Sequence, residues 1–124
     1  MKRDIELVRK ILLFFEEKED PKPVEIPPID GYNDFTIKTH LVMMHDAGLI
    51  RCEPVRSSSS DRVIYVLPFE LTWAGHDFVQ TMRDDNLWKK AKELVIKPGA
   101  SWSFDILKEW AKIEVKKRLG MPVD

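Results

Sequence analysis

The pattern of apolar positions begins with a helical repeat over residues 4–18. Apolar side chains recur three or four positions apart in two neighbouring rows, so the predicted helix carries a stripe wide enough to be covered on more than one side. Asp4 precedes the repeat and has the side chain of a good N-cap. The two rows consist of Ile5, Val8, Leu12 and Phe15 and of Leu7, Ile11 and Phe14.

A proline-rich stretch separates this helix from the next one. Four prolines lie between residues 21 and 33. Because proline lacks a backbone donor and disfavours helix, we expect an extended or looped connection there. Within it, Val24-Glu25-Ile26 is predicted to add a short edge strand to the hairpin that follows.

A second helical repeat covers residues 34–47. Asn33 or Asp34 is expected to cap it, and Gly48 can take the left-handed conformation that ends a helix. The face predicted to point into the core consists of Ile37, Leu41 and Met44.

Two runs rich in Val and Ile predict an antiparallel hairpin. The runs cover residues 49–55 and 63–67, and the polar segment 56–62 forms the tip between them. Pro54 and Pro68 are expected to bound the paired part, since proline is tolerated at strand ends.

Three more helices are predicted over residues 71–82, 86–96 and 103–120. All four tryptophans of the chain fall in or near these helices, and we expect each of them in the core by default. If one tryptophan is exposed or lies at a subunit contact, we expect it to be Trp102. The expected caps are Thr72, Asn86 and either Ser101 or Ser103, and the apolar face of the last helix is predicted to hold Ile106, Trp110 and Ile113.

These elements predict an α+β fold, mainly α: a winged helix-turn-helix with a small antiparallel hairpin and extra C-terminal helices. We expect a single domain over residues 1–124, with a core over 4–82 and a helical extension over 86–120. The prolines leave little room for the short helix that usually precedes a recognition helix, so the predicted fold departs from the usual pattern at that point.

Composition narrows the functional classes. The 124 residues are 44% hydrophobic and 33% charged, with a net charge of -1, whereas a dedicated nucleic-acid binder is usually basic. Cys52 is the single cysteine, so no intramolecular disulfide is possible, which fits a reducing cytoplasm. No export signal and no uncharged run that could span a bilayer is found, so we expect a cytoplasmic protein without a membrane partner.

Two sequence motifs resemble known families. Ala47-Gly48-Leu49-Ile50, followed after a hairpin by Leu71-Thr72-Trp73-Ala74-Gly75-His76, is similar to the winged helices of regulators of the multiple-antibiotic-resistance and phenolic-acid types. Those motifs together with Met1-Lys2-Arg3-Asp4, His40-Leu41 and Arg83-Asp84-Asp85 resemble domain-of-unknown-function family 2513 over most of the chain. That resemblance implies a winged helix and a phage or mobile-element origin, and it implies no activity.

Little in the sequence predicts catalysis, a metal or a cofactor. His40 and His45 are five residues apart, which is unfavourable for binding one metal from one helical face. His76 is expected to bond to the hairpin, and nothing around Cys52 indicates an activated thiolate. Neighbouring Asp84 and Asp85 point apart on a helix, so they are expected to be capping or solvated groups. We therefore expect a protein that is not an enzyme and that carries no cofactor.

Two functions remain open from the sequence. The first is binding to double-stranded DNA, with the helix in the major groove and the hairpin tip on phosphates. The second is a protein-interaction or homodimerisation module, which would use either the apolar outward side of the same helix or the wide apolar stripe of residues 5–15. The candidate DNA contacts are Thr36, Lys38, Thr39 and His40 on the helix and Arg56, Ser57, Ser58 and Arg62 at the tip, and the candidate partner contacts are Val42, Met43 and Trp102.

Overall fold

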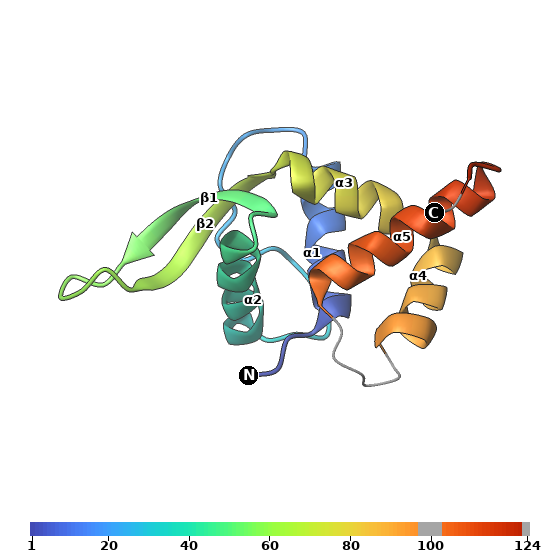
Figure 1. Ribbon diagram of the computed structural model, residues 1–124. Helices are drawn as coiled ribbons and strands as arrows, with labels where there is room; N and C mark the ends of the chain where they lie inside the picture. The colour runs from blue at the N-terminus through green and yellow to red at the C-terminus, as the bar shows by residue number, and fades with distance from the viewer. Residues whose placement is uncertain (97–102, 123–124) are drawn as a thin grey trace. The chain divides into compact units, whose positions relative to one another are not determined.

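The computed structural model describes residues 1–96 and 103–122 and shows an α+β fold that is mainly helical (Figure 1). The predicted order helix, strand, strand, helix is present in the middle of the chain. The chain divides into two compact units, residues 1–79 and 80–124. The elements are α1 (Ile5–Glu17), α2 (Asp34–Asp46), β1 (Ile50–Arg56), β2 (Val63–Leu71), α3 (Trp73–Met82), α4 (Asp85–Ala91) with a π-helical turn (Lys92–Ile96), and α5 (Phe104–Arg118).

Side-chain caps fix the starts of the helices. Asp4 accepts from the backbone N–H groups of the first turn of α1, and Asn33 accepts from Thr36 N–H at 2.8 Å at the start of α2. Ser103 caps α5, and Thr72, directly before α3, accepts from Gly75 N–H, so four predicted caps are confirmed. The cap of α4 is Asp84, one of the two aspartates predicted to be capping or solvated groups, and not Asn86, because the carboxylate of Asp84 reaches two free N–H groups of the first turn.

Both predicted core faces of the first unit are buried. The two apolar rows of α1 are covered apart from Phe14, and α2 packs against β2. The buried apolar residues include Leu7, Ile11 and Leu12 of α1, Ile37, Leu41 and Met44 of α2, and Ile50, Val66 and Leu71 of the strands.

The sheet consists of the antiparallel pair β1 and β2, and it corrects two predictions. Pro54 lies opposite Val66 and Pro68 opposite Cys52, so both prolines lie inside the ladder instead of bounding it. Proline fits there because its nitrogen points to the outer edge of the sheet, where no donor is needed for the partner strand. Residues 24–26 do not form the predicted edge strand, since a single bond from Val24 N–H to Pro68 O, 2.9 Å long, joins this segment to β2.

A tight joint connects the end of α2 to the start of α3. Gly48 has a φ of 74° and ends α2, as predicted. Thr72 then donates its backbone N–H to Leu49 O at 3.1 Å and its hydroxyl to Gly48 O at 2.6 Å, while its Oγ1 accepts from Gly75 N–H at 3.1 Å. A Cβ atom on Gly75 would lie 2.2 Å from Leu49 O, so only glycine allows this approach.

The position of Gly75 explains why the prediction for Trp73 is wrong. The side chain of Trp73 is 83% exposed. Residues two apart on a helix point to nearly opposite sides, so a helix that turns Gly75 toward the strand must turn Trp73 toward solvent.

The second unit contains α4 and α5. Leu87, Trp88 and Ala91 of α4 are buried, and so are Leu107 and Ala111 of α5. The predicted apolar face of α5 is therefore displaced by about one residue around the helix, since Ile106 is 50% exposed. None of the helices in the described ranges has the length and apolar character that crossing a membrane requires.

Candidate interaction surface

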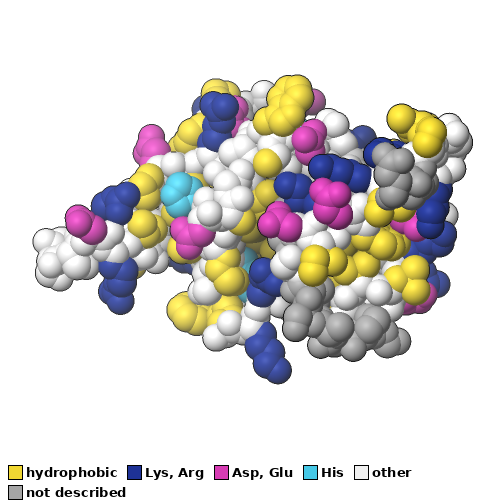
Figure 2. All heavy atoms as spheres, viewed as in Figure 1, with side chains coloured by type: hydrophobic (Ala, Val, Ile, Leu, Met, Phe, Trp, Pro, Cys, Tyr) yellow, Lys and Arg dark blue, Asp and Glu magenta, His cyan; other side chains and the backbone are white. Residues whose placement is uncertain are grey.

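An apolar groove lies between the outward face of α2 and the start of β2. Its volume is about 400 Å³. Phe35 is 70% exposed and Ile64 51% exposed, so two large apolar side chains flank an opening that is itself mainly apolar. Figure 2 shows yellow side chains along this part of the molecule, over α2 and the adjoining hairpin. The groove is lined by Phe35, Lys38, Thr39, Val42, Met43, Val63, Ile64 and Tyr65.

The groove brings together residues that were predicted for two different functions. Val42 and Met43 were predicted as partner contacts, and Lys38 and Thr39 as DNA contacts. Helical spacing explains why these four residues of α2 lie close together. It does not predict that side chains of β2 form the other wall of the groove. The sequence did not predict Val63, Ile64 and Tyr65 as partner contacts. The strand pattern predicts that Ile64 is extended, but it does not indicate that this residue lies at a β-bulge with its side chain exposed.

The ammonium of Lys38 is held inside the first unit. Its Nζ lies 3.1 Å from Glu25 Oε1 and 4.9 Å from the centroid of the Tyr65 ring. The Lys38 side chain is 32% exposed. Lys38 is the one lysine among the described residues that line the groove, and its carboxylate and aromatic partners compete with any anion outside.

The other helix residues predicted to contact DNA are also engaged within the fold. The hydroxyl of Thr39 donates to Phe35 O at 2.8 Å, and Thr36 is half-buried. The prediction for His40 needs correction, because its ring is fully buried. Its Nε2 accepts from Asp4 N–H at 2.8 Å, so its Nδ1 carries the proton and donates to Thr36 O at 2.9 Å.

The structure places the predicted hairpin residues together at an exposed tip. Ser57 N–H donates to Arg62 O at 2.8 Å and closes the turn, and Arg56 Nη1 donates to Asp61 O at 2.8 Å. Ser58 and the side chain of Arg62 are exposed. Figure 2 shows basic and acidic side chains flanking the pale tip, so its charge is mixed.

A thiol and an imidazole meet across the end of α2. The Sγ atom of Cys52 lies 3.0 Å from Nδ1 of His45. Burial, with a smaller contribution from Asp46, raises the pKa of the Cys52 thiol from 9.0 to about 11. The thiol is therefore protonated near neutral pH and can donate to the ring, and this pair lacks the thiolate that a nucleophile requires.

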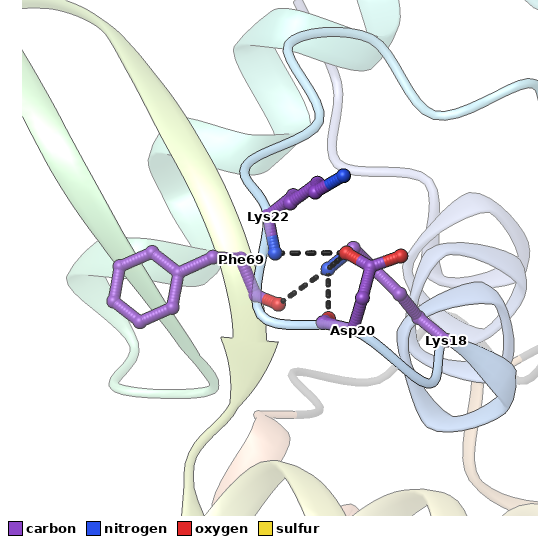
Figure 3. A network of polar contacts seen from close by, with 4 residues as sticks. All are labelled: Lys18, Asp20, Lys22 and Phe69. Carbon is purple, nitrogen blue, oxygen red and sulfur yellow. Dashed lines mark hydrogen bonds and ion pairs between the residues drawn. The ribbon is translucent and has the colours of Figure 1, made fainter.

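A polar network ties the start of the proline-rich connection to β2 (Figure 3). The Lys18 ammonium, on a side chain only 8% exposed, donates to Phe69 O at 3.2 Å and to Asp20 Oδ1 at 3.1 Å, and it also contacts Asp20 O. The backbone N–H of Lys22 donates to the same carboxylate at 2.8 Å. The Lys22 N–H, followed by Lys18, lowers the pKa of Asp20. A cavity of about 290 Å³ beside this network has the exposed His76 on its rim.

Two further predictions concern residues outside these surfaces. Trp102, a predicted partner contact, lies outside the described residues. Within the described ranges, no three His, Cys, Asp or Glu side chains come close enough together to hold a metal ion.

Comparison with known proteins identifies the family. An uncharacterised protein from Haemophilus influenzae is 30% identical over 123 residues, which cover 97% of this chain and 100% of that protein. No solved structure matches the chain. The family described as "Hypothetical protein (DUF2513)" matches residues 2–101. The chain therefore belongs to the DUF2513 family.

Proposed function

We propose that residues 1–79 form a winged-helix module that binds a protein through the groove between α2 and β2. The order of α1, α2, β1, β2 and α3 supports the winged helix, with α2 in the position of the recognition helix and the hairpin as the wing. The connection 18–33 contains no helix, so the module lacks the short helix of an ordinary helix-turn-helix.

The observation that carries this proposal is the apolar character of the groove where a DNA reader has hydrogen-bond donors. Sequence readout in the major groove requires side chains such as Arg, Asn or Gln, and the groove offers Val42, Met43 and Ile64. Charge favours the same conclusion. Residues 1–79 contain 10 Lys and Arg and 14 Asp and Glu, a net charge of -4, which repels a polyanion.

Photocrosslinking in the producing cell tests the groove. A photoreactive phenylalanine analogue at Phe35 or at Ile64 is expected to form a discrete protein adduct on irradiation. Trp73, which is exposed and does not line the groove, is the matched control position. An adduct of twice the chain mass identifies a second copy as the partner, and another mass identifies a different protein.

A charge inside the groove provides the second part of the test. Val42→Glu, combined with the analogue at Phe35, is expected to reduce the adduct yield about tenfold or more, since a buried unpaired carboxylate costs well over ~1.4 kcal/mol. Circular dichroism checks that the variant is folded. Equal adducts from Trp73 and from the groove positions, or none from the groove, would contradict the proposal.

The hairpin tip supports a second candidate, binding to duplex DNA. Arg56 and Arg62 flank four serines at an exposed loop, an arrangement that can contact phosphates without reading bases. This candidate predicts an affinity that falls steeply with salt and falls further in Arg56→Ala combined with Arg62→Ala. No gel shift with pooled duplex fragments at low salt would exclude it.

A further inference from the structure

Positive charge is concentrated in the second unit of the chain. Residues 80–124 contain 10 Lys and Arg and 7 Asp and Glu, a net charge of +3, against -4 for residues 1–79. Most of this excess lies in the C-terminal half of α5, where Lys112, Lys116, Lys117 and Arg118 accompany a single acid, Glu114. The near-neutral charge of the whole protein conceals this asymmetry.

The acid in this region is recessed and the cations are exposed. Glu114 has a side chain only 13% exposed, and its two carboxylate oxygens lie 3.8 Å from Lys90 Nζ of α4 and 3.5 Å from Lys117 Nζ of α5. Those two lysine side chains are 56% and 58% exposed. Two ammonium groups from different helices therefore converge over one carboxylate that solvent hardly reaches, and the surface they present is positive.

Exposed cations adjacent in sequence to these two lysines add positive charge to the same two helices. Lys89 and Lys116 are exposed and form no ion pair with a described residue. Arg118, 41% exposed, is paired with Asp84 at 2.9 Å, and that carboxylate is already occupied in capping α4. Figure 2 shows dark-blue side chains gathered over α4 and the end of α5. We call this surface the basic face and define it by Lys89, Lys90, Lys116, Lys117 and Arg118.

We propose that the basic face binds the phosphodiester backbone of a nucleic acid, without reading its sequence. Lysine ammonium groups act as point charges for phosphate oxygens, and a strand offers a phosphate at each step to several lysines at once. Phosphates compete with Glu114 for Lys90 and Lys117, so the recessed acid moderates the affinity. This binding does not depend on the groove of the first unit, and it places nucleic-acid contact on α4 and α5 instead of on the hairpin tip.

Salt-dependent binding to fluorescent duplex DNA and duplex RNA of mixed sequence tests the proposal in the full-length protein. Lys89, Lys90, Lys116 and Lys117 are changed together to Gln. The matched control changes Lys2, Lys10, Lys22 and Arg51, four exposed cations of the first unit that lie outside the hairpin tip, to Gln, so both variants lose the same charge. We expect the affinity of the first variant at about 50 mM salt to fall at least about tenfold, with a salt slope smaller by up to about 0.9 for each phosphate that the variant leaves unneutralised. The control variant is expected to retain the affinity and the salt slope of the wild type.

A single substitution is expected to raise the affinity for nucleic acid instead of lowering it. Glu114→Gln removes the internal competitor and is expected to raise the affinity severalfold, whereas Glu53→Gln on β1 makes the same charge change at an exposed site of the first unit and is expected to have little effect. Comparison of DNA with RNA shows which nucleic acid binds more tightly.

Several results would overturn the proposal. One is that the protein does not bind nucleic acid at low salt, and another is that the control variant loses as much affinity as the first variant. A third is that the protein binds vesicles with anionic lipid but not nucleic acid. Loss of stability with unchanged affinity would also show that the lysines only offset the negative ends of α4 and α5. None of these results bears on the crosslinking test of the groove, so the two proposals can fail separately.

Discussion

At the scale of single residues, the positions that carry the family resemblance have structural roles. Asp4 caps α1 and donates its N–H to the buried ring of His40, which joins the start of α1 to α2. Gly48, Thr72 and Gly75 form the joint between α2 and α3. These residues hold the fold together, so the resemblance gives no information about a reaction.

The thiol of Cys52 yields a prediction about pH. Its pKa is raised from 9.0 to about 11, first by burial and then by Asp46, so the folded state binds the proton more tightly than the unfolded chain. The resulting stabilisation is complete below pH 9.0 and is lost as the pH rises toward about 11. Urea unfolding at rising pH is therefore expected to show a loss of stability in the wild type that is smaller in Cys52→Ser.

Alkylation provides a separate measurement of the same group. The rate of reaction of Cys52 with iodoacetamide is expected to rise about tenfold per pH unit up to its pKa. Asp46→Asn removes a nearby negative charge and is expected to shift this profile to lower pH. A profile with a plateau near neutral pH would contradict the raised pKa.

Residues also show where sequence patterns were insufficient. Helical periodicity placed Ile37, Leu41 and Met44 in the core correctly, because burial of a helix face depends on local spacing. It could not place His40, whose burial depends on a bond to Asp4, 36 residues away. It also assigned Trp73 to the core, because the close approach of Gly75 to Leu49 is not visible in the pattern of apolar positions.

At the scale of elements, the function depends on how α2 is presented beside β2. The outward face of α2 is only moderately apolar, and β2 converts it into a groove by adding Val63, Ile64 and Tyr65. The connection 18–33 contributes as well, since Glu25 holds Lys38 and the network around Lys18 fixes this segment against β2. Two segments, the connection through Glu25 and β2 through Tyr65, therefore hold the ammonium group of Lys38, the one lysine of the helix that was predicted to read DNA.

The joint between α2 and α3 gives a stability prediction. Gly75→Ala would add about 0.8–1.0 kcal/mol of helix propensity, but its Cβ would meet Leu49 O at 2.2 Å and force the backbone of two elements apart. The steric cost exceeds the propensity gain, so we expect a net loss of about 1–3 kcal/mol in the free energy of unfolding.

Urea denaturation measures this loss. Gly31→Asn is the matched control, because Gly31 has a φ of 87° with no atom near its missing Cβ and Asn tolerates that conformation. An increase in stability for Gly75→Ala would show that the backbones are not in close contact.

At the scale of the whole molecule, the distribution of charge between the two units says more about nucleic-acid binding than the total charge does. A net charge of -1 argued against nucleic-acid binding, yet it is the sum of an acidic first unit and a basic second unit. The two candidate surfaces belong to different units, so a groove for protein and a face for phosphates can coexist in one chain of 124 residues.

The second unit is closed by an ion pair between its two ends. Arg118 Nη1 lies 2.9 Å from Asp84 Oδ2 and joins the end of α5 to the start of α4, 34 residues earlier. The backbone N–H of Leu87, followed by Arg118, lowers the pKa of Asp84 below 3.8. The carboxylate therefore stabilises the fold above its ordinary pKa, and this stabilisation is lost as the pH falls through the lowered value.

Asp84→Asn tests this pair, since Asn still caps a helix but cannot hold Arg118 by charge. We expect the variant to unfold at lower denaturant than the wild type near pH 7, with a difference that shrinks at acid pH as Asp84 is protonated. Asp85→Asn removes the same charge at the next position and serves as the control. A difference that stays constant across the whole pH range would exclude the ionised pair as its cause.

The sequence by itself determined most of the elements, most of their caps and most of the core, because these depend on local periodicity and on side chains within a few residues of each helix end. Only the tertiary structure decided which side chains are exposed and which of the exposed charges are paired. Whether Lys38 is free, whether His40 reaches solvent and whether Glu114 cancels its neighbouring lysines depend on contacts between distant segments. Charge and burial of a side chain depend on those contacts, and for that reason the groove and the basic face could not be predicted from the sequence.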